Sequence, residues 1–323
     1  MQNVGGEYRC VSCSAAYPIR YGIPDFRLSP DPYISVEAEL AKIEKLLAPP
    51  AKSFRELLNV YYELSPENPP ELNAHYIASM EGSVIRGSAI LRKLRNIAPD
   101  LGDRRILDIG CGSAGLAVAA SKEFAEVVGV DVALRWLLIG RQRLNESGPA
   151  AAKVALICAN AEALPFRSAA FEAVVADAVI EHVRDSSMMR DETLRVLAGD
   201  GAFFFTTNNR YSVLPEPDVR ILGFGLLPRR WMEKAALALR KTPYRTRLHS
   251  RRELRSVFKN VGRVDLPSYE PNELGRRNER ARRIWDVLSR IPPIRWAMGP
   301  IVPQYFVSGR RTWEVESVLR ARR

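Results

Sequence analysis

The stretch RILDIGCGSAGLAVAASKEFAEVVGVD, residues 105–131, decides the fold. It contains an apolar strand, a glycine-containing turn, a helix of small and apolar residues, and a second apolar strand that ends in an acidic residue. Gly110, Gly112 and Gly115 have the Gly-x-Gly-x-x-Gly spacing, in which missing side chains let backbone amides approach a ligand at a helix N-terminus. The stretch predicts the first βαβ unit of a doubly wound α/β sheet.

Two acidic residues narrow the choice of ligand for this turn. Asp131 lies about twenty residues after the first glycine, where a carboxylate would accept hydrogen bonds from ribose hydroxyls, as in nicotinamide and flavin sites. Asp108, two residues before that glycine, would repel a pyrophosphate but attract the ammonium of an amino-acid-like ligand. S-adenosylmethionine carries that ammonium and no phosphate. We therefore expect it as the cofactor.

Further motifs follow in order over roughly residues 75–265. ANAEALPF (159–166) resembles the stretch that packs along adenine, FEAVVADAVIEHV (171–183) the fourth strand and its exit, and RVLAGDG (195–201) the turn before the fifth strand. Together with residues 105–131 they resemble the class I S-adenosylmethionine-dependent methyltransferases. The resemblance implies a Rossmann-like sheet of seven strands and these cofactor contacts: Asp108, Gly110, Cys111, Gly112, Gly115, Asp131, Val132, Asn160, Ala161, Glu162 and Asp177. Asn160 stands where the family usually has an aspartate that accepts from the adenine amine.

The candidate catalytic residues follow the fourth strand. Asp177 ends that strand, and Glu181 and His182 come in the first turn beyond it, in a segment similar to the same exit in quinone-biosynthesis O- and C-methyltransferases. His182 is the candidate general base, because an imidazole can take a hydroxyl proton near neutral pH. One alternative is that Glu181 and His182, with Asp177, hold a divalent ion; another is that His182 is structural. We expect no metal.

The absence of two sequence motifs narrows the chemical class of the methyl acceptor. Enzymes that methylate base or amide nitrogens often carry Asn/Asp-Pro-Pro-Tyr/Phe after the fourth strand, and this chain has Asp177-Ala178-Val179-Ile180 there. Pyrimidine C5 methylation needs a cysteine nucleophile, commonly after proline, and none of the four cysteines has that context. We expect O-methylation of a glycan precursor, lipid-linked sugar or small metabolite, because residues 208–230 resemble methyltransferases of such pathways. The alternatives are tRNA methylation and a non-catalytic cofactor-binding partner protein.

Charge is distributed unevenly along the chain. Residues 229–323 carry 24 Lys and Arg against 9 Asp and Glu, whereas residues 1–228 carry 24 against 28. A basic region of this kind could bind RNA, an anionic membrane surface or a phosphorylated substrate, or form a solvated face. No apolar run is long enough for a transmembrane helix, and the first twenty residues lack a signal-peptide pattern. We expect a cytoplasmic protein, with peripheral contact to the inner face of the membrane as a further hypothesis.

The N-terminus contains half of a metal-binding pattern. Residues 8–26 hold a Cys-x-x-Cys knuckle, Cys10 and Cys13, and resemble the second half of a small zinc ribbon of the type that activates tRNA methyltransferases. Structural zinc needs four ligands, and one knuckle supplies two. We expect residues 1–30 to form a degenerate, metal-free hairpin. The alternative is that a first knuckle lies upstream of residue 1.

The rest of the chain predicts helices around the sheet. Residues 31–100 are expected to form a helical N-terminal cover, with helices at 36–47, 53–64 and 72–94. The methyltransferase domain is expected over residues 101–323. An insertion at 208–249 follows the fifth strand and is expected as a lid over the acceptor pocket, because insertions at the carboxyl ends of strands lie over the ligand crevice. After it we expect a helix at 250–260, a basic helix at 272–290, and a last strand, 302–308, as the antiparallel edge of the sheet.

Overall fold

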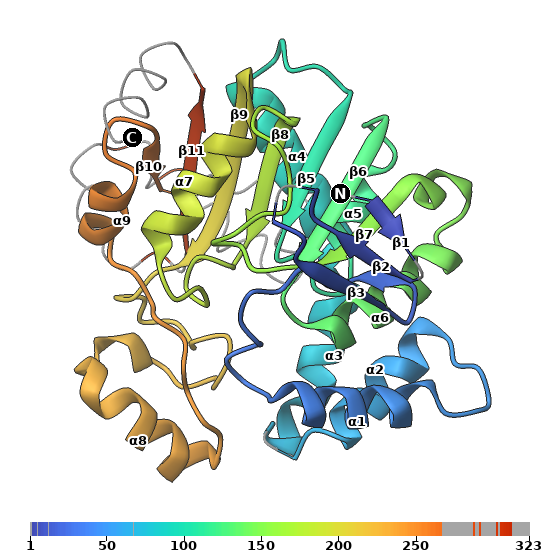
Figure 1. Ribbon diagram of the computed structural model, residues 1–323. Coiled ribbons are helices and arrows are strands. Elements are labelled where there is room, and N and C mark those ends of the chain that lie inside the picture. Colours follow the sequence, from blue (N-terminus) through green and yellow to red (C-terminus); the bar gives the residue numbers. More distant parts are fainter. Residues whose placement is uncertain are drawn as a thin grey trace.

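The computed structural model describes residues 2–4, 6–11, 13–66, 68–266 and 304–311, with Val287, Ile291 and Val302. Its centre is a seven-stranded sheet in the order β10-β11-β9-β8-β5-β6-β7, in which the five strands from β9 to β7 are parallel (Figure 1). The strands are β5 (Arg105–Ile109), β6 (Glu126–Asp131), β7 (Val154–Cys158), β8 (Phe171–Asp177), β9 (Leu197–Asn208), β10 (Arg263–Asp265) and β11 (Gln304–Arg310). The predicted doubly wound α/β fold is confirmed.

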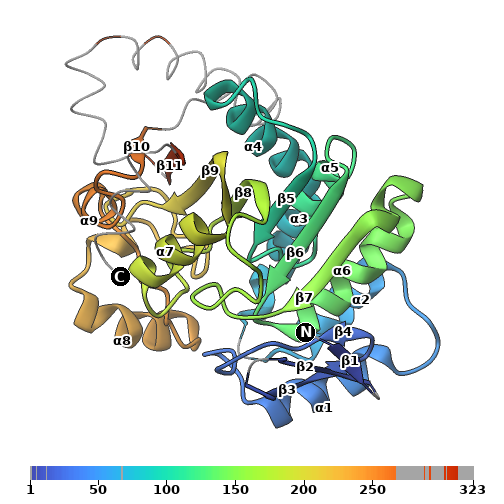
Figure 2. The same cartoon turned by 45° about the horizontal axis from the view of Figure 1, so that its top comes forward.

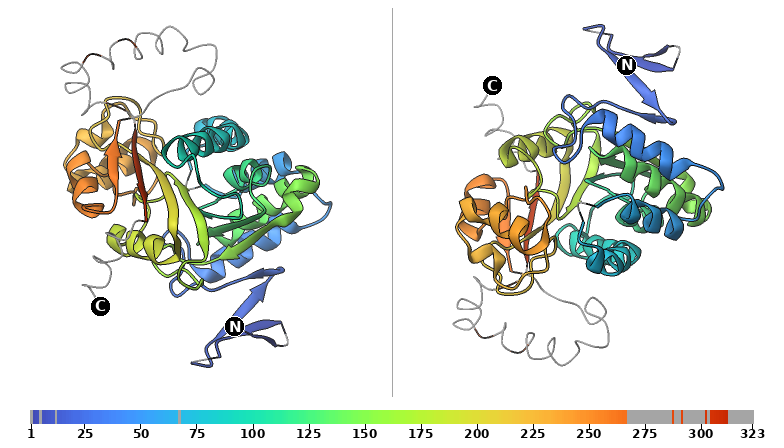
Figure 3. Two further views of the ribbon diagram at one scale, coloured as in Figure 1. Left: turned by 90° about the horizontal axis from the view of Figure 1, so that it is seen from above. Right: turned by 90° about the horizontal axis from the view of Figure 1, so that it is seen from below.

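Helices cover both faces of the sheet (Figure 3). On one face α4, α5 and α6 pack on side chains such as Ile106 and Val175, and on the other α7 and α9 pack on the alternate side chains, such as Leu107 and Val174. Because both faces are covered, β5 and β8 are nearly continuous apolar runs. The helices are α4 (Ser83–Ile97), α5 (Gly115–Ala120), α6 (Leu134–Glu146), α7 (Ser186–Val196) and α9 (Arg251–Val257).

The N-terminal part adds a small sheet and a helical layer (Figure 2). The small sheet is antiparallel and contains β1 (Gln2–Val4), β2 (Glu7–Arg9), β3 (Ala16–Arg20) and β4 (Ile23–Pro24). It reaches the main sheet where Asp25 pairs with Cys158 at the end of β7. Helices α1 (Val36–Leu47) and α2 (Phe54–Glu63) pack against α6, so the predictions for 36–47 and 53–64 are confirmed to within a residue at each end.

The single helix predicted over 72–94 is wrong. The chain forms a short 3₁₀ turn, η1 (Pro70–Leu72), then α3 (Asn73–Glu81), and α4 begins after Gly82. The hydroxyl of Ser83 donates to the carbonyl of Met80 at 2.6 Å and accepts from Arg143 at 2.6 Å. A Gly-Ser pair whose hydroxyl competes for the helical ladder is a common cause of such a break.

The prediction that the last strand forms the edge of the sheet is also wrong. The antiparallel strand β11 lies between β9 and β10, and the three-residue strand β10 is the edge. A strand as short as β10 leaves too few residues for a period-two pattern to be recognised. The basic helix predicted at 272–290 lies outside the described residues, apart from Val287.

The insertion at 208–249 forms a compact unit beside the sheet. It contains η3 (Phe224–Leu226) and α8 (Arg229–Arg240), and its two ends meet in a bridge between Asn209 and His249. Phe224, Met232 and Tyr244 belong to a hydrophobic cluster within the insertion itself. Figure 1 shows it below the carboxyl ends of the central strands, on the same side as α1 and α3. This is the side on which ligands bind in doubly wound sheets.

Candidate cofactor and active site

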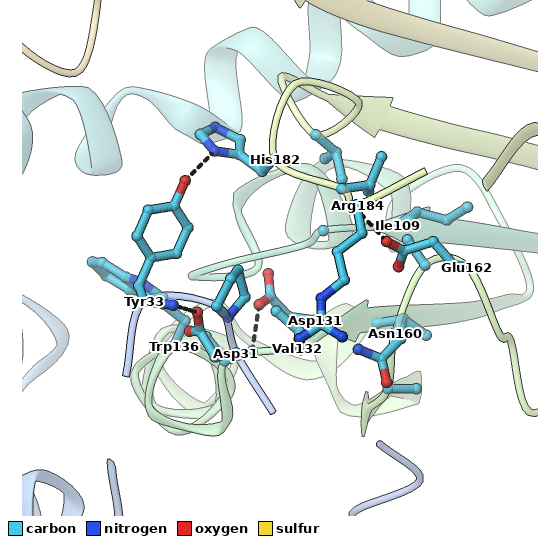
Figure 4. Close-up of a pocket in the computed structure, with 18 of the residues that line it drawn as sticks. Asp31, Tyr33, Ile109, Asp131, Val132, Trp136, Asn160, Glu162, His182 and Arg184 are labelled. Atoms are coloured by element: carbon cyan, nitrogen blue, oxygen red, sulfur yellow. Dashed lines mark hydrogen bonds between the residues drawn. The ribbon is translucent and has the colours of Figure 1, made fainter. Parts of the chain in front are cut away.

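A cavity of about 250 Å³ opens at the carboxyl ends of β5, β6 and β8 (Figure 4). Asp131 and Val132 line it from the end of β6, Ala161 and Glu162 from the loop after β7, and His182 from the turn after β8. This is the crevice that the parallel strand order predicts for a ligand.

The glycine turn forms the floor of the cavity. Gly110 has φ +67°, and a Cβ atom added there would lie 2.4 Å from Cγ2 of Val179. Only glycine meets both the left-handed backbone and this close approach without strain. The turn therefore brings the backbone of β5 against the segment after β8, where the candidate catalytic residues lie.

Asp131 closes the end of β6. Its Oδ2 accepts from the amide of Gly112 and its Oδ1 from the amide of Ala133, both at 2.8 Å. Burial raises the pKa of Asp131 to about 6, although these two amide hydrogen bonds lower it. Each carboxylate oxygen keeps a second lone pair, so the group can accept from two vicinal hydroxyls.

Asp108 is almost completely buried, with 2% of its surface exposed, beneath the cavity floor. Its Oδ2 has no hydrogen-bond partner within the described part of the chain. Burial raises its pKa well above the usual range, and the charges of Asp177 and Asp131 raise it further. The charges of two neighbouring carboxylates thus act on the buried Asp108, an arrangement that a cationic ligand would relieve.

Comparison with known proteins identifies the central part of the chain. Residues 107–205 match the family model described as "Methyltransferase domain". These residues form a methyltransferase domain. The ubiquinone biosynthesis O-methyltransferases of Paracidovorax citrulli and Idiomarina loihiensis are 30% and 31% identical over 160 and 118 residues. These alignments cover 49% and 36% of this chain and 60% and 47% of the relatives, so the chain spans about half the length of the curated relatives it matches.

Solved structures resemble the chain more distantly. An S-adenosylmethionine-dependent methyltransferase from Mesorhizobium loti has a TM-score of 0.46 and 18% identity, covering 68% of this chain and 96% of its own. Phosphoethanolamine N-methyltransferase 2 from Haemonchus contortus, in complex with S-adenosyl-L-methionine, has a TM-score of 0.49 and 17% identity, covering 81% and 60%.

The cavity of the methyltransferase domain fits S-adenosylmethionine. The cofactor carries a sulfonium and an ammonium, and the oxygen of Asp108 that has no hydrogen-bond partner among the described residues feels the charges of two further carboxylates, Asp177 and Asp131. Asp131 offers acceptors for ribose hydroxyls at the position that the sequence predicts. A dinucleotide would bring phosphate to the same acidic floor, which disfavours it.

The side chain of Asn160 has a second role that the sequence did not reveal. Its Oδ1 accepts from the amides of Leu28 and Ser29, at 2.9 and 3.2 Å, and its Nδ2 donates to the Ser29 carbonyl and hydroxyl, both at 3.1 Å. Both lone pairs of the amide oxygen are therefore engaged within the chain. In this arrangement Asn160 fastens residues 28–29 to the cavity rim, and its oxygen has no free lone pair for an adenine amine.

The three candidate catalytic residues point in different directions. Asp177 accepts from the hydroxyl of Thr206 at 2.6 Å and lies 3.6 Å from the guanidinium of Arg86. Glu181 is completely buried and accepts from Thr207 at 2.9 Å and from Asn208 at 2.9 and 3.2 Å, so it fastens the turn after β8 to the end of β9. Burial raises the pKa of Glu181, while the neighbouring His182 lowers it.

His182 alone of these three lines the cavity. Its Nδ1 lies 3.0 Å from the hydroxyl of Tyr33, as the dashed line in Figure 4 shows. No group of three or more potential metal ligands occurs among the described residues. The divergence of Glu181 and His182 also removes the shared coordination sphere that the metal alternative requires.

Sequence reasoning missed the outer wall of the cavity. It is formed by residues 30–33, which follow the small N-terminal sheet, and by Trp136 in the first turn of α6. The sequence position of Trp136 was a weak indication that it lines the cavity, because it lies in the first turn of α6, shortly after Asp131. Nothing in the sequence indicated that residues 30–33 line the cavity, since only the tertiary fold brings this segment to β6.

A buried ionic network holds that wall in place. Arg27 donates to both oxygens of Asp25, at 2.9 and 2.7 Å, and to Glu39 at 2.6 Å. Arg135 on α6 donates to Glu39 at 2.9 Å and to Asp31 at 2.7 Å. Arg27 also donates to the carbonyl of Val132 beside Asp131, at 3.1 Å. The network therefore connects the N-terminal segment directly to the end of the cavity formed by Asp131 and Val132.

The remaining predicted contacts divide between the cavity and its support. The residues that line the cavity are Gly110, Asp131, Val132, Asn160, Ala161, Glu162 and His182. The predicted residues that are not part of its lining are Asp108, Cys111, Gly112, Gly115, Asp177 and Glu181. Burial raises the pKa of the Cys111 thiol well above its usual range, with Asp108 adding to the shift. Cys111 therefore packs as a neutral thiol against the sheet. Cys10 and Cys13 lie in the turn that joins β2 to β3.

Proposed function

We propose that this protein transfers the methyl group of S-adenosylmethionine to a hydroxyl oxygen of a glycan precursor, a lipid-linked sugar or a small metabolite. The observation that carries the proposal is that His182 and Asp131 line the same cavity. One is the residue type suited to take a hydroxyl proton, and the other is suited to hold the ribose.

The cofactor, when bound, supplies an electrophilic methyl group on a sulfonium. The residues of this chain then have two tasks, to position an acceptor hydroxyl beside the cavity and to remove its proton. His182 takes that proton as the acceptor oxygen replaces sulfur on the methyl carbon, with the electron pair of the broken carbon–sulfur bond left on the sulfur. It releases the proton to solvent afterwards. In this proposal Glu181 and Asp177 hold the turn and the strand end in place, and they do not contact the acceptor.

Oxygen as the acceptor atom is supported by the relatives. The matching curated proteins from Paracidovorax citrulli and Idiomarina loihiensis are named as O-methyltransferases. The strand exit Asp177-Ala178-Val179-Ile180 lacks the proline-rich motif that often accompanies nitrogen methylation. A general base on the cavity wall is needed for a hydroxyl acceptor, because that acceptor keeps its proton until methyl transfer.

We further propose that the insertion at 208–249 contacts an anionic membrane surface from which a lipid-linked acceptor is reached. Residues 208–249 carry nine Lys and Arg against three Asp and Glu. Helix α8 buries Met232 and Ala236 against the insertion, while Trp231, 54% exposed, and Lys234 lie on its outer face. Basic and aromatic side chains on one exposed helix face suit the interface of an anionic bilayer. No helix among the described residues is long and apolar enough to span a membrane.

Vesicle sedimentation tests the membrane contact. We expect the protein to sediment with phosphatidylglycerol vesicles and to remain in solution with phosphatidylcholine vesicles, and a Trp231→Ala/Lys234→Glu double variant to lose at least five-fold in binding. Ile85→Ala is the control, because it removes an exposed apolar side chain on α4, outside residues 208–249. Equal binding by the wild type and the double variant would reject this contact.

The catalytic proposal is tested by a transfer assay with S-adenosylmethionine labelled in its methyl group. Glycan, lipid and RNA fractions are offered in parallel, and label is expected in an alkali-stable ether of a glycan or lipid product. Label in RNA would replace the proposed acceptor with the tRNA alternative. Cofactor binding without transfer to any fraction would favour the non-catalytic alternative.

A further inference from the structure

The cavity leaves one side for the adenine of the cofactor. In Figure 4 Asp131 lies between two groups of side chains that line the cavity. Tyr33 and His182 are on one side of it, and Asn160 and Glu162 are on the other. With the ribose on Asp131 and the transferred methyl group near His182, the base lies along the loop after β7, residues 159–162. The acceptor for the adenine amine is therefore expected on this loop.

The side chain of Asn160 is not available as that acceptor. Its amide oxygen already accepts from the amides of Leu28 and Ser29, at 2.9 and 3.2 Å, and its nitrogen donates twice to Ser29. An amide oxygen has two lone pairs and an amide nitrogen two hydrogens, so the whole group is used within the chain. The adenine amine therefore needs another acceptor on the same loop.

Glu162 offers an acceptor two residues further along. Its side chain lines the cavity and is partly buried. Its Oε1 accepts from the amide of Arg184 at 2.8 Å, which fixes the carboxylate against the segment after β8. Its Oε2 has no hydrogen-bond partner within the described part of the chain. An ionised carboxylate only accepts hydrogen bonds, so this oxygen is suited to an amine.

The other two carboxylates among the described residues that line the cavity are engaged elsewhere. Asp31, on the outer wall, accepts from Arg135 at 2.7 Å and from the amide of Tyr33 at 2.8 Å. Asp131 accepts from two amides at the end of β6, where the ribose is expected. Glu162 is therefore the carboxylate left for the base.

The backbone before Glu162 supplies a complementary donor. Ala161 lines the cavity, and its amide donates to no acceptor among the residues that the structure describes. The pairing edge of adenine presents an amine hydrogen beside the ring nitrogen N1, which is a donor next to an acceptor. A carboxylate oxygen and an amide N–H match that edge. The edge of hypoxanthine, with a 6-oxo group and an N1–H, has both roles reversed.

We infer that Glu162, and not Asn160, accepts the hydrogen bond of the adenine amine and makes the site specific for an adenine nucleoside. Asn160 is then a positioning residue, which holds residues 28–29 at the rim of the cavity. The inference rests on the proposed function for the identity of the cofactor, and it does not depend on the methyl acceptor.

Calorimetry with two nucleosides tests the inference without any methyl acceptor. S-adenosylhomocysteine and S-inosylhomocysteine differ only in the pairing edge of the base, so the ratio of their Kd values reports on the group that faces this edge. The wild type should bind the adenine compound roughly 100-fold more tightly, because the 6-oxo group would meet a carboxylate. In Glu162→Gln the ratio should fall below about five-fold, because an amide can turn its NH₂ group toward the 6-oxo group.

Two further variants separate recognition of the base from general damage to the site. Asn160→Ala should weaken the binding of both compounds together, because the rim loosens, and should keep the wild-type ratio. Glu126→Gln, at an exposed carboxylate at the start of β6, is the matched control and should change neither affinity.

Three results would overturn the inference. One is a ratio that falls in Asn160→Ala and stays at the wild-type value in Glu162→Gln, and another is a wild type that binds both compounds equally well. In either case the proposed methyl transfer would stand, because the labelled-transfer assay does not depend on which residue faces the base. The third is a folded wild type that binds neither compound, which would remove the proposed cofactor and this inference together.

Discussion

Replacing Arg135 with methionine tests whether the buried ionic network holds the cavity wall. The change keeps most of the volume of the side chain but removes the guanidinium that lies 2.7 Å from Asp31 and 2.9 Å from Glu39. The side chains of these two acids are 3% and 1% exposed. Two cations would then remain for the three carboxylates of Asp25, Asp31 and Glu39: the buried Arg27, and Arg20, which is partly exposed and lies 3.2 Å from Asp25.

The expected loss in the free energy of unfolding follows from removing one buried guanidinium. Breaking a buried ion pair by removing one partner typically costs about 3–5 kcal/mol, because it leaves an uncompensated buried charge. Glu39→Gln should cost less, about 1–2 kcal/mol, since Asp25 keeps Arg27, Asp31 keeps Arg135, and the new side chain keeps an amide oxygen as acceptor. At roughly 2–4 °C per kcal/mol, Arg135→Met is expected to lower Tm by about 10 °C.

Thermal and urea unfolding measure this difference directly. The matched control is Arg55→Met, which removes an exposed pair with Glu81 at 3.0 Å and should cost less than about 1 kcal/mol. An Arg135→Met cost no larger than that of the control would refute the reasoning. So would a Glu39→Gln variant that is less stable than Arg135→Met.

Three further outcomes are expected. Burial raises the pKa of Asp131 to about 6, and the carboxylate form is the better acceptor for ribose hydroxyls. The affinity for S-adenosylmethionine, measured by calorimetry, should therefore fall as the pH drops below 6. The Asp131→Asn variant should show no such fall. His182→Ala should lower turnover by roughly two to four orders of magnitude with cofactor affinity nearly intact, and chelators should leave wild-type turnover unchanged. Elemental analysis should find no stoichiometric zinc, because Cys10 and Cys13 supply two of the four ligands that structural zinc requires; one zinc per chain would contradict this.

The sequence was sufficient where a function depends on local geometry. The glycine turn at 110–115 and the strand end at Asp131 are adjacent in one βαβ unit, so spacing alone predicts both the sheet and the position of the Asp131 carboxylate beside the turn. His182 could be predicted because the carboxyl end of β8 must lie beside that of β5. The direction of Glu181 could not, because adjacent residues of a turn diverge and its partners lie on β9.

The features that were missed depend on contacts between distant segments. The Asn160 amide is bonded to residues 28–29, more than 130 positions earlier in the chain, and no periodicity encodes that contact. The same holds for Tyr33, whose hydroxyl lies 3.0 Å from Nδ1 of His182, 149 positions later in the chain. The edge position of β10 and the break at Gly82 were missed for a different reason, since short elements and side-chain competition for a helical ladder leave little pattern.

Calorimetric titration of the purified protein with S-adenosylmethionine tests the central claim, that the cavity between Asp131 and His182 is a methyl-donor site. The account predicts one site per chain, at least ten-fold weaker binding in Asp131→Ala, and nearly unchanged binding in His182→Ala. It also predicts no detectable binding of NAD, whose pyrophosphate would meet the acidic floor around Asp108. A folded wild-type protein that does not bind S-adenosylmethionine, or that binds it equally well without the Asp131 carboxylate, would contradict the account.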